Sequence, residues 1–251
     1  FSSFRMFFAY GGSFIALFCW EPLCNAMGGY SPPAGWQHAM IVIAAACLVL
    51  FILCFAMTRE KMHSETTSSI GSDFKSLIRN APWWLLIGAA LCSNLFNTVR
   101  GSTVAYFFAD VIGQDVTLHL GGLSFLFYAG LFLSIGEVCN MIGVALTTPI
   151  AAVLGKKSTY IVSMAALIVL SIAFFFVPVS AAGYWVMIAL QVVISIFTGI
   201  ISPLIWSMYA DVSDFAEERD GTASTGLIFS SASMAQKFGG AFGGYAVMAL
   251  L

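Results

Sequence analysis

Charged side chains are scarce in this 251-residue sequence. Asp, Glu, Lys and Arg together make up 9% of it, and hydrophobic residues make up 60%. An ordinary soluble domain has about 25% charged residues. A soluble fold of this size could not bury so much apolar surface and would aggregate. The shortage of charge therefore excludes a soluble domain, and a net charge of −2 gives no indication of nucleic-acid binding.

Motifs for catalysis or metal binding are also missing. The six cysteines include no Cys-x-x-Cys pair and no cysteine–histidine cluster, so we interpret them as small apolar residues. The three histidines form no HExxH motif, and the sequence has no GxSxG motif or phosphate-binding glycine loop. We therefore expect no enzyme activity, no metal site and no cofactor.

Long apolar runs are what the sequence does contain. Seven of them lie at about 4–27, 37–57, 83–112, 120–152, 158–180, 182–206 and 222–251. Each exceeds the roughly 17 residues that a membrane-spanning helix needs. Backbone groups in lipid must be hydrogen-bonded within the segment, which favours continuous helices. The sequence therefore predicts an all-α polytopic membrane protein with seven transmembrane helices.

Lys and Arg occur in every second connection between these runs. Residues 58–82 carry four of them, Lys156 and Lys157 follow the fourth run, and Arg219 follows the sixth. The connections between carry none, and basic loops stay in the cytoplasm. We therefore expect a multi-pass protein of the plasma (inner) membrane, with residue 1 inside and Leu251 outside. Tryptophans near the ends of runs, Trp206 among them, are expected to be interfacial anchors.

One stretch, residues 209–244, joins an acidic segment to an apolar segment rich in glycine, alanine and serine. Lys237 is the one charge in that apolar segment, and we expect it to be buried against other helices. Two overlapping pairs of glycines four residues apart follow it, at 239/243 and 240/244. Small residues at this spacing allow another helix to approach closely.

The same stretch resembles a known family. The segments ADVSDFAE, GLIFSS and QKFGGAFGG are similar to those of the glycoside–pentoside–hexuronide:cation symporters, the melibiose permease-like branch of the major facilitator superfamily. SSFRMFFAYGGSF resembles the start of that family's helix V, and NLFNTVRGSTVAYFFADVIG resembles its helix VII. Members carry several basic residues after the acidic segment, whereas this chain has only Arg219 there.

The resemblance implies a major facilitator fold of which this chain holds helices V–XI of twelve. Residues 1–57 would be the last two helices of the N-terminal half, 58–82 the central cytoplasmic linker, and 83–251 the C-terminal half without its last helix. It also implies symport of a sugar or glycoside with a cation, Na⁺ or H⁺, by alternating access. The expected partners are the sugar, the cation, the lipid bilayer and the remaining helices of the same transporter, whose helices II and IV would hold the cation. A carrier of another solute, or a transporter-like sensor that moves nothing, are the alternatives.

The resemblance also implies a set of site residues. For substrate binding we expect Lys237, Arg5, Asn94 and Tyr106, and for gating we expect Asp211 and Asp214. Each has a plainer interpretation. Lys237 would only tie two helices together, Arg5 would reach the cytoplasmic interface, and Asn94 would bond to a neighbouring helix.

For the two acids, the plainer interpretation is a solvated surface rather than a gate that pairs with Lys156 or Lys157. Three further polar residues lie within the runs without an assigned role, namely Arg100, Glu137 and Asn140. Such intramembrane groups need a water-filled cavity or a partner on another helix.

The alternation of basic connections predicts membrane sidedness. In a cysteine-free protein, single cysteines introduced at Ser69 and Ser31 should react with an impermeant maleimide from opposite sides of the membrane. Ser69 should be labelled only after the cytoplasmic side is exposed. Labelling of both positions from the same side would contradict the expected order of spans.

Overall fold

The computed structural model describes residues 2–29, 33–58, 74, 77–112, 116–120, 123–220 and 225–250. It divides into two compact units, one of Phe1–Gly12 with Ser68–Leu251 and one of Ser13–Thr67. Helix α1 (Ser2–Ala26) begins in the first unit and continues into the second. Most of the predicted linker 58–82 lies outside the described residues, so its role stays a prediction.

The smaller unit contains the rest of α1 and helix α2 (Pro33–Met57). Proline at the first helical position is favourable because its missing N–H would have no partner there. Trp20 and Trp36 meet edge to face across the connection, with ring centroids 5.2 Å apart. These bounds agree with the predicted runs 4–27 and 37–57 to within a few residues.

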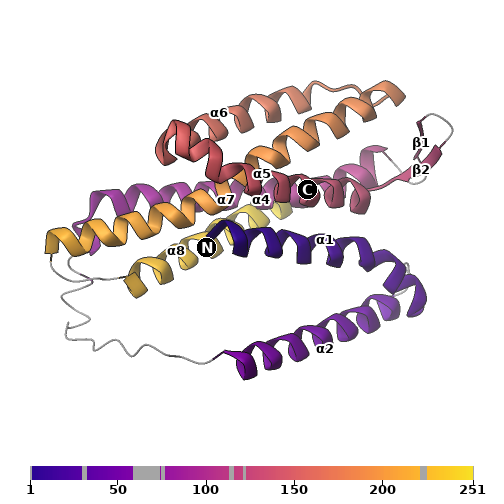
Figure 1. The fold of residues 1–251 in the computed structure, drawn as a ribbon. Helices are drawn as coiled ribbons and strands as arrows, with labels where there is room; N and C mark the ends of the chain where they lie inside the picture. Colours follow the sequence, from indigo (N-terminus) through magenta and orange to yellow (C-terminus); the bar gives the residue numbers. More distant parts are fainter. Residues whose placement is uncertain are drawn as a thin grey trace. The chain divides into compact units, whose positions relative to one another are not determined.

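The larger unit holds five long helices, which run side by side in Figure 1. They are α4 (Ala81–Tyr106), α5 (Ala129–Leu154), α6 (Lys156–Phe175), α7 (Ala181–Asp220) and α8 (Thr225–Leu250). Helix α4 is capped by Asn80, whose side chain accepts a hydrogen bond from the Trp83 amide. A π-helical segment, Phe107–Ile112, follows α4 directly.

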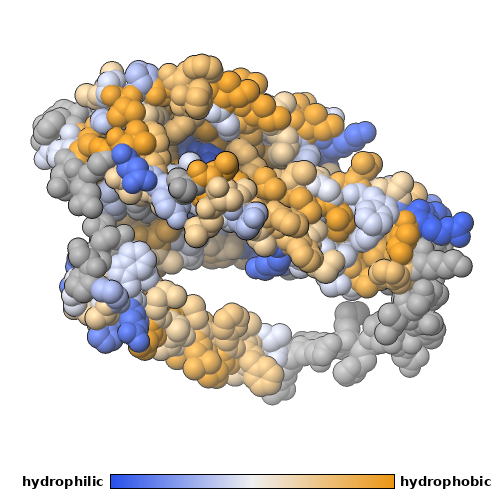
Figure 2. Space-filling view, turned by 180° about the vertical axis from the view of Figure 1, so that it is seen from behind, coloured by the Kyte–Doolittle hydropathy of each residue, from blue (hydrophilic) through white to orange (hydrophobic). Residues whose placement is uncertain are grey.

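Four of the described helices are long and apolar enough to cross a membrane by length and composition alone, namely α2, α5, α6 and α7. Helices α1, α4 and α8 have similar lengths, 25 or 26 residues, but include more polar side chains. Apolar side chains cover most of the visible surface (Figure 2). The predicted class, a polytopic helical membrane protein, is therefore confirmed. The crossing of the bilayer by α1, α4 and α8 remains a prediction.

Helix α8 packs against α4 through one of the two predicted glycine pairs. A methyl group on Gly243 would lie 3.0 Å from the Leu95 carbonyl oxygen, and one on Gly239 would collide with the Leu91 carbonyl. The predicted close approach is therefore confirmed for Gly239 and Gly243. The other pair does not make this contact, because the position of a methyl group on Gly244 has no atom within 4 Å.

Helix α5 also packs against α7 through glycines, and here each helix contributes one. Gly143 of α5 faces the carbonyl oxygen of Ile196, and Gly199 of α7 faces the carbonyl oxygen of Asn140. The Thr147 hydroxyl also donates to the Ile200 carbonyl at 3.3 Å. The two helix pairs, α4 with α8 and α5 with α7, therefore approach at near backbone contact.

The predicted run 120–152 is helical only from Ala129 onward. Its first residues pair instead with the preceding segment, in an antiparallel hairpin of β1 (Val116–Leu120) and β2 (Leu123–Phe127). Phe127 is buried against Phe108, Phe132 and Tyr184. Aromatic packing thus selects strand over helix here.

The acidic segment also differs from the prediction, which placed it in a loop. Helix α7 is 40 residues long and reaches Asp220, so Asp211 and Asp214 are helical residues one turn apart. Tyr209, Val212 and Ala216 are buried in the core beside this segment. Their spacing supplies an apolar stripe that holds the extension against its neighbours.

The glycine contact between α8 and α4 predicts a localised loss of stability. Gly239→Leu should force the helices apart and lower the free energy of unfolding by about 1–3 kcal/mol, as overpacking typically does. Gly244→Leu is the matched control, because its added side chain enters open space. Thermal unfolding in detergent measures both. Equal unfolding temperatures for the two variants would contradict the proposed packing role of Gly239.

Candidate functional site

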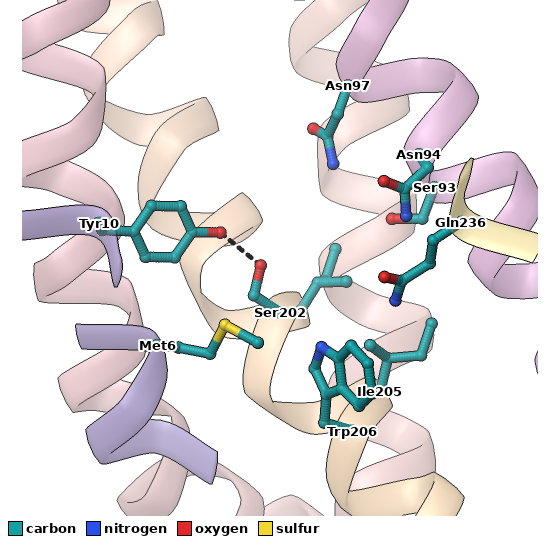
Figure 3. Close-up of a pocket in the computed structure, with 10 residues that line it drawn as sticks. Met6, Tyr10, Ser93, Asn94, Asn97, Ser202, Ile205, Trp206 and Gln236 are labelled. Carbon is teal, nitrogen blue, oxygen red and sulfur yellow. Dashed lines mark hydrogen bonds between the residues drawn. The ribbon is translucent and has the colours of Figure 1, made fainter. Parts of the chain in front are cut away.

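A cavity of about 220 Å³ lies in the larger unit, among α1, α4, α7 and α8. Figure 3 shows the residues that line it. They are Met6 and Tyr10 of α1, Ser93, Asn94 and Asn97 of α4, Ile201, Ser202, Ile205 and Trp206 of α7, and Gln236 of α8. Three of these four helices, α1, α4 and α8, are those that contain more polar side chains. The cavity accounts for the polar residues of α1, α4 and α8 that line it.

The lining combines hydroxyl and amide groups without a formal charge. The Tyr10 and Ser202 hydroxyls are hydrogen-bonded to each other, and the Asn94 side chain donates to the Ala90 carbonyl at 3.2 Å. Each hydroxyl can donate and accept, and each amide offers both functions. Such a lining suits a neutral ligand with several hydroxyl groups better than a strongly charged one.

Trp206 forms an aromatic wall of the cavity. Its ring stacks on Phe229 with centroids 6.0 Å apart and planes 13° apart. The Arg5 guanidinium carbon lies 4.8 Å from the ring centroid. The role of Trp206 as an interfacial anchor stays a prediction, and α7 continues from it to Asp220, about four further turns.

The structure brings only some of the predicted substrate residues to this cavity. Asn94 lines it, and so does Asn97 one turn further along α4. Arg5 contacts Trp206 but does not itself line the cavity. Tyr106 lies twelve residues from Asn94, about 18 Å along the helix, and its hydroxyl donates to the Met248 sulfur at 3.9 Å. Tyr106 is therefore away from the cavity.

Lys237 is not buried by the helices of this chain, so its predicted burial against other helices stays a prediction. It follows Gln236, which lines the cavity, but its own side chain is exposed. The reason is the orientation of α8, which presents Gly239 and Gly243 to α4 and turns Lys237 to another face. No hydrogen bond or ion pair joins Lys237 to the described part of the chain.

The polar residues without an assigned role form two separate groups. The Arg100 guanidinium donates to the Gln191 side-chain oxygen, and Gln191 donates to the Phe132 carbonyl at 3.4 Å. On α5, the Asn140 side-chain nitrogen donates to Glu137 Oε2 at 3.3 Å. The sequence could not pair Arg100 with Gln191, whereas Glu137 and Asn140 have the three-residue spacing of neighbours on a helix.

Asp211 forms an ion pair with Lys156, at the ends of α7 and α6. The Lys156 Nζ lies 2.6 and 2.7 Å from the two carboxylate oxygens. Both side chains are about half exposed, at 42% and 51%. Asp214 is exposed and forms no ion pair within the described residues. The predicted pairing partner is thus present for Asp211, whereas its gating role stays a prediction.

Sequence reasoning missed several lining residues, namely Tyr10, Ser93, Ser202 and Gln236. Isolated hydroxyl and amide residues within apolar runs look the same whether they bond to a neighbouring helix or line a cavity. Gln236 had one available signal, its position directly before the only charged residue of its run. Among the described residues, no group of three His, Cys, Asp or Glu side chains is placed to hold a metal ion.

The family described as MFS/sugar transport protein matches the chain over residues 1–251. The inner membrane symporter YicJ of Escherichia coli is 29% identical over 243 residues, which is 96% of this chain and 50% of that protein. The putative glycoside/cation symporter YagG of the same organism is 27% identical over 98% of this chain and 51% of that protein. The isoprimeverose transporter of Lactiplantibacillus pentosus is 28% identical over 97% of this chain and 49% of that protein.

A solved structure of a mutant Escherichia coli fucose:proton symporter, FucP, covers 94% of this chain and 68% of that one, with a TM-score of 0.49 and 15% identity. The assignment does not depend on that structure. The chain belongs to the MFS/sugar transport protein family, and the resemblance to the glycoside–pentoside–hexuronide:cation symporters is confirmed. It is an integral, multi-pass protein of the inner membrane. The chain spans about half the length of the curated relatives it matches.

Proposed function

We propose that the complete protein is a secondary active symporter that moves a sugar or glycoside with a cation, Na⁺ or H⁺, by alternating access. The observation that carries this proposal is the cavity, which is uncharged, rich in hydroxyl and amide groups and walled by Trp206. The names of the relatives, which include a glycoside/cation symporter and an isoprimeverose transporter, support it.

Sugar recognition follows from the chemistry of the lining. Asn94, Asn97 and Gln236 would bond to sugar hydroxyls, each bond contributing about 0.5–1.5 kcal/mol net. The apolar face of a sugar ring would rest on Trp206, because aromatic rings combine a large apolar surface with little conformational freedom. The volume of about 220 Å³ is below the roughly 300–1,000 Å³ of pockets for drug-sized ligands. We infer that this half of the protein accommodates one sugar ring.

Arg5 supports the sugar site indirectly, because its guanidinium holds the Trp206 ring from one side. Lys237 lies next to Gln236 on a face with Ser233 and Gly240, where another helix can approach closely. We propose that it binds the sugar or a carboxylate from helices outside this chain. We assign Tyr106 no sugar contact, because about 18 Å of helix separates it from Asn94.

Asp211 and Asp214 would have different roles in gating at the cytoplasmic end. Lys156 and Asp211 belong to the same unit, so their ion pair joins the ends of α6 and α7 rather than the two halves of a transporter. Exposed pairs of this kind contribute about 0–1 kcal/mol. Asp214, one turn further along α7, is available to pair with a basic residue of the other half. We infer that Asp214 makes the contact between halves that closes this end, while Asp211 positions it.

Two alternatives remain. The protein would be a carrier of another solute in the same family, or a sensor that binds sugar without transporting it. The coupling ion would bind largely outside this chain, on helices II and IV. Uptake of labelled xylosides, galactosides, glucosides and glucuronides by the complete protein in proteoliposomes separates these functions. Accumulation driven by an imposed sodium or pH gradient would support symport. Binding without accumulation would indicate a sensor, and no binding would indicate another solute.

The aromatic wall predicts a loss of sugar affinity on truncation. Trp206→Ala should weaken sugar binding at least tenfold, because the apolar face of the ring loses its contact surface. Trp84→Ala is the matched control. Trp84 is also in a long helix, but it is 53% exposed and bonds to the Ile78 carbonyl, outside the cavity lining. Calorimetric titration of the complete protein measures both. Unchanged affinity in Trp206→Ala would remove Trp206 from the site.

The gating role predicts a defect in accumulation rather than in binding. Replacing Asp211 and Asp214 together by Asn should lower gradient-driven accumulation several-fold while sugar affinity stays within a few-fold, because the change shifts the balance between states and leaves the site intact. Glu217→Gln with Glu218→Gln is the control at the same helix end. Both of those side chains are exposed. Normal accumulation by the double Asn variant would leave the two acids as ordinary solvated charges.

A further inference from the structure

Glu137 is a carboxylate inside the helical bundle that the sugar site does not use. It lies eight residues after the start of α5 at Ala129, about 12 Å along the helix, and its side chain is half buried. Ionisable residues at membrane depth are energetically costly and usually mark ion or substrate pathways. The polar groups near Glu137 indicate which cation its carboxylate could bind.

Glu137 sits beside the wall of the cavity rather than in it. Helix α1 approaches this part of α5 at Gly11, where an added methyl group would lie 3.6 Å from the Met141 side chain. Tyr10, the residue before Gly11, lines the cavity, and Met141 lies one turn after Glu137 on α5. A change of charge at Glu137 therefore acts on a group that faces the sugar.

Asn140 is arranged to serve a carboxyl group in both of its protonation states. Its nitrogen now donates to Glu137 Oε2 at 3.3 Å. Its oxygen is buried and has no hydrogen-bond partner among the described residues. An amide can rotate so that oxygen replaces nitrogen, and the Asn140 oxygen could then accept from a protonated Glu137. The unused acceptor is what a protonated carboxylic acid requires.

The elements packed around Glu137 contribute few other ionisable groups. Helix α1 contributes Tyr10, and α4 contributes Arg100, whose hydrogen-bond partner is Gln191. Helix α7 has no ionisable residue between Tyr184 and Tyr209, and α6 has none between Tyr160 and its end at Phe175. The amide N–H facing Glu137 is a donor, which would repel a metal cation but stabilises a carboxylate.

We propose that Glu137 is a proton-binding site of this half of the transporter, coupled to the sugar cavity through Tyr10. The proposal rests on the proposed function and adds a site to the cation carboxylates expected on helices II and IV. A proton from the outer aqueous side binds the Glu137 carboxylate, whose new O–H donates to the Asn140 oxygen. After the transporter opens inward, the proton leaves to cytoplasmic water, and the carboxylate again accepts from the Asn140 nitrogen.

The test measures sugar affinity of the complete protein against pH, using the nitrophenyl glycoside that binds it most tightly among those of xylose, galactose, glucose and glucuronic acid. If sugar binds the protonated form, the parent's Kd should rise about tenfold per pH unit above its midpoint, because each bound sugar then takes up one proton. Glu137→Gln mimics the protonated acid, so its Kd should keep the parent's low-pH value at every pH. It should also exchange sugar but lose accumulation driven by a pH gradient.

Asp110→Asn is the matched control, because Asp110 is an exposed acid in the π-helical segment after α4, and it should retain the parent's pH dependence. A parent Kd that does not vary with pH, or a Glu137→Gln variant that keeps the parent's pH dependence, would overturn the proton site while leaving the sugar site intact. If Glu137→Gln does not fold, Asn140→Ala provides the test. We expect this variant to shift the pH midpoint of the sugar Kd, and an unchanged midpoint would overturn the proposal. Absence of binding by any of the four glycosides would overturn the proposed function and this site with it.

Discussion

The close contact of helix backbones at glycine is the constraint on which the rest of the larger unit depends. Gly239 and Gly243 hold α8 against α4, while Gly143 and Gly199 hold α5 against α7. In lipid, apolar side chains gain little from leaving one apolar environment for another, so close packing and hydrogen bonds supply much of the association. These contacts fix the positions of four helices and so determine where their polar residues can meet.

Polar groups of different kinds are kept apart within this framework. The cavity lining is uncharged, with hydroxyls and amides around Trp206. Arg5 lies over the Trp206 ring without lining the cavity, and Lys156 pairs with Asp211 away from it. Such separation suits a site for neutral hydroxylated solutes, because an unpaired charge in the lining would favour ionic ligands instead. It also leaves Glu137 near the site without making it part of the lining.

The sequence was sufficient for the class of fold, because long uncharged runs have few alternatives to membrane helices. It also predicted the Gly239/Gly243 contact, because small residues four apart lie on one face of a helix and allow another helix to approach closely. It could not locate the cavity, because Tyr10, Ser202 and Gln236 are far apart in the chain and each resembles an ordinary polar residue in a span. It could not give the exposure of Lys237 within this chain or the contacts of Trp206. These depend on the rotation of α8 and the length of α7, which tertiary packing decides.

The most direct test of the central claim is a structure of the complete protein with a bound glycoside. We expect a sugar ring against Trp206, with its hydroxyls within hydrogen-bond distance of Asn94, Asn97 and Gln236. Lys237 would be next to that ring or paired with an acid from the other half. A sugar bound elsewhere, with Trp206 covered by a protein side chain, would show that this cavity is not the sugar site.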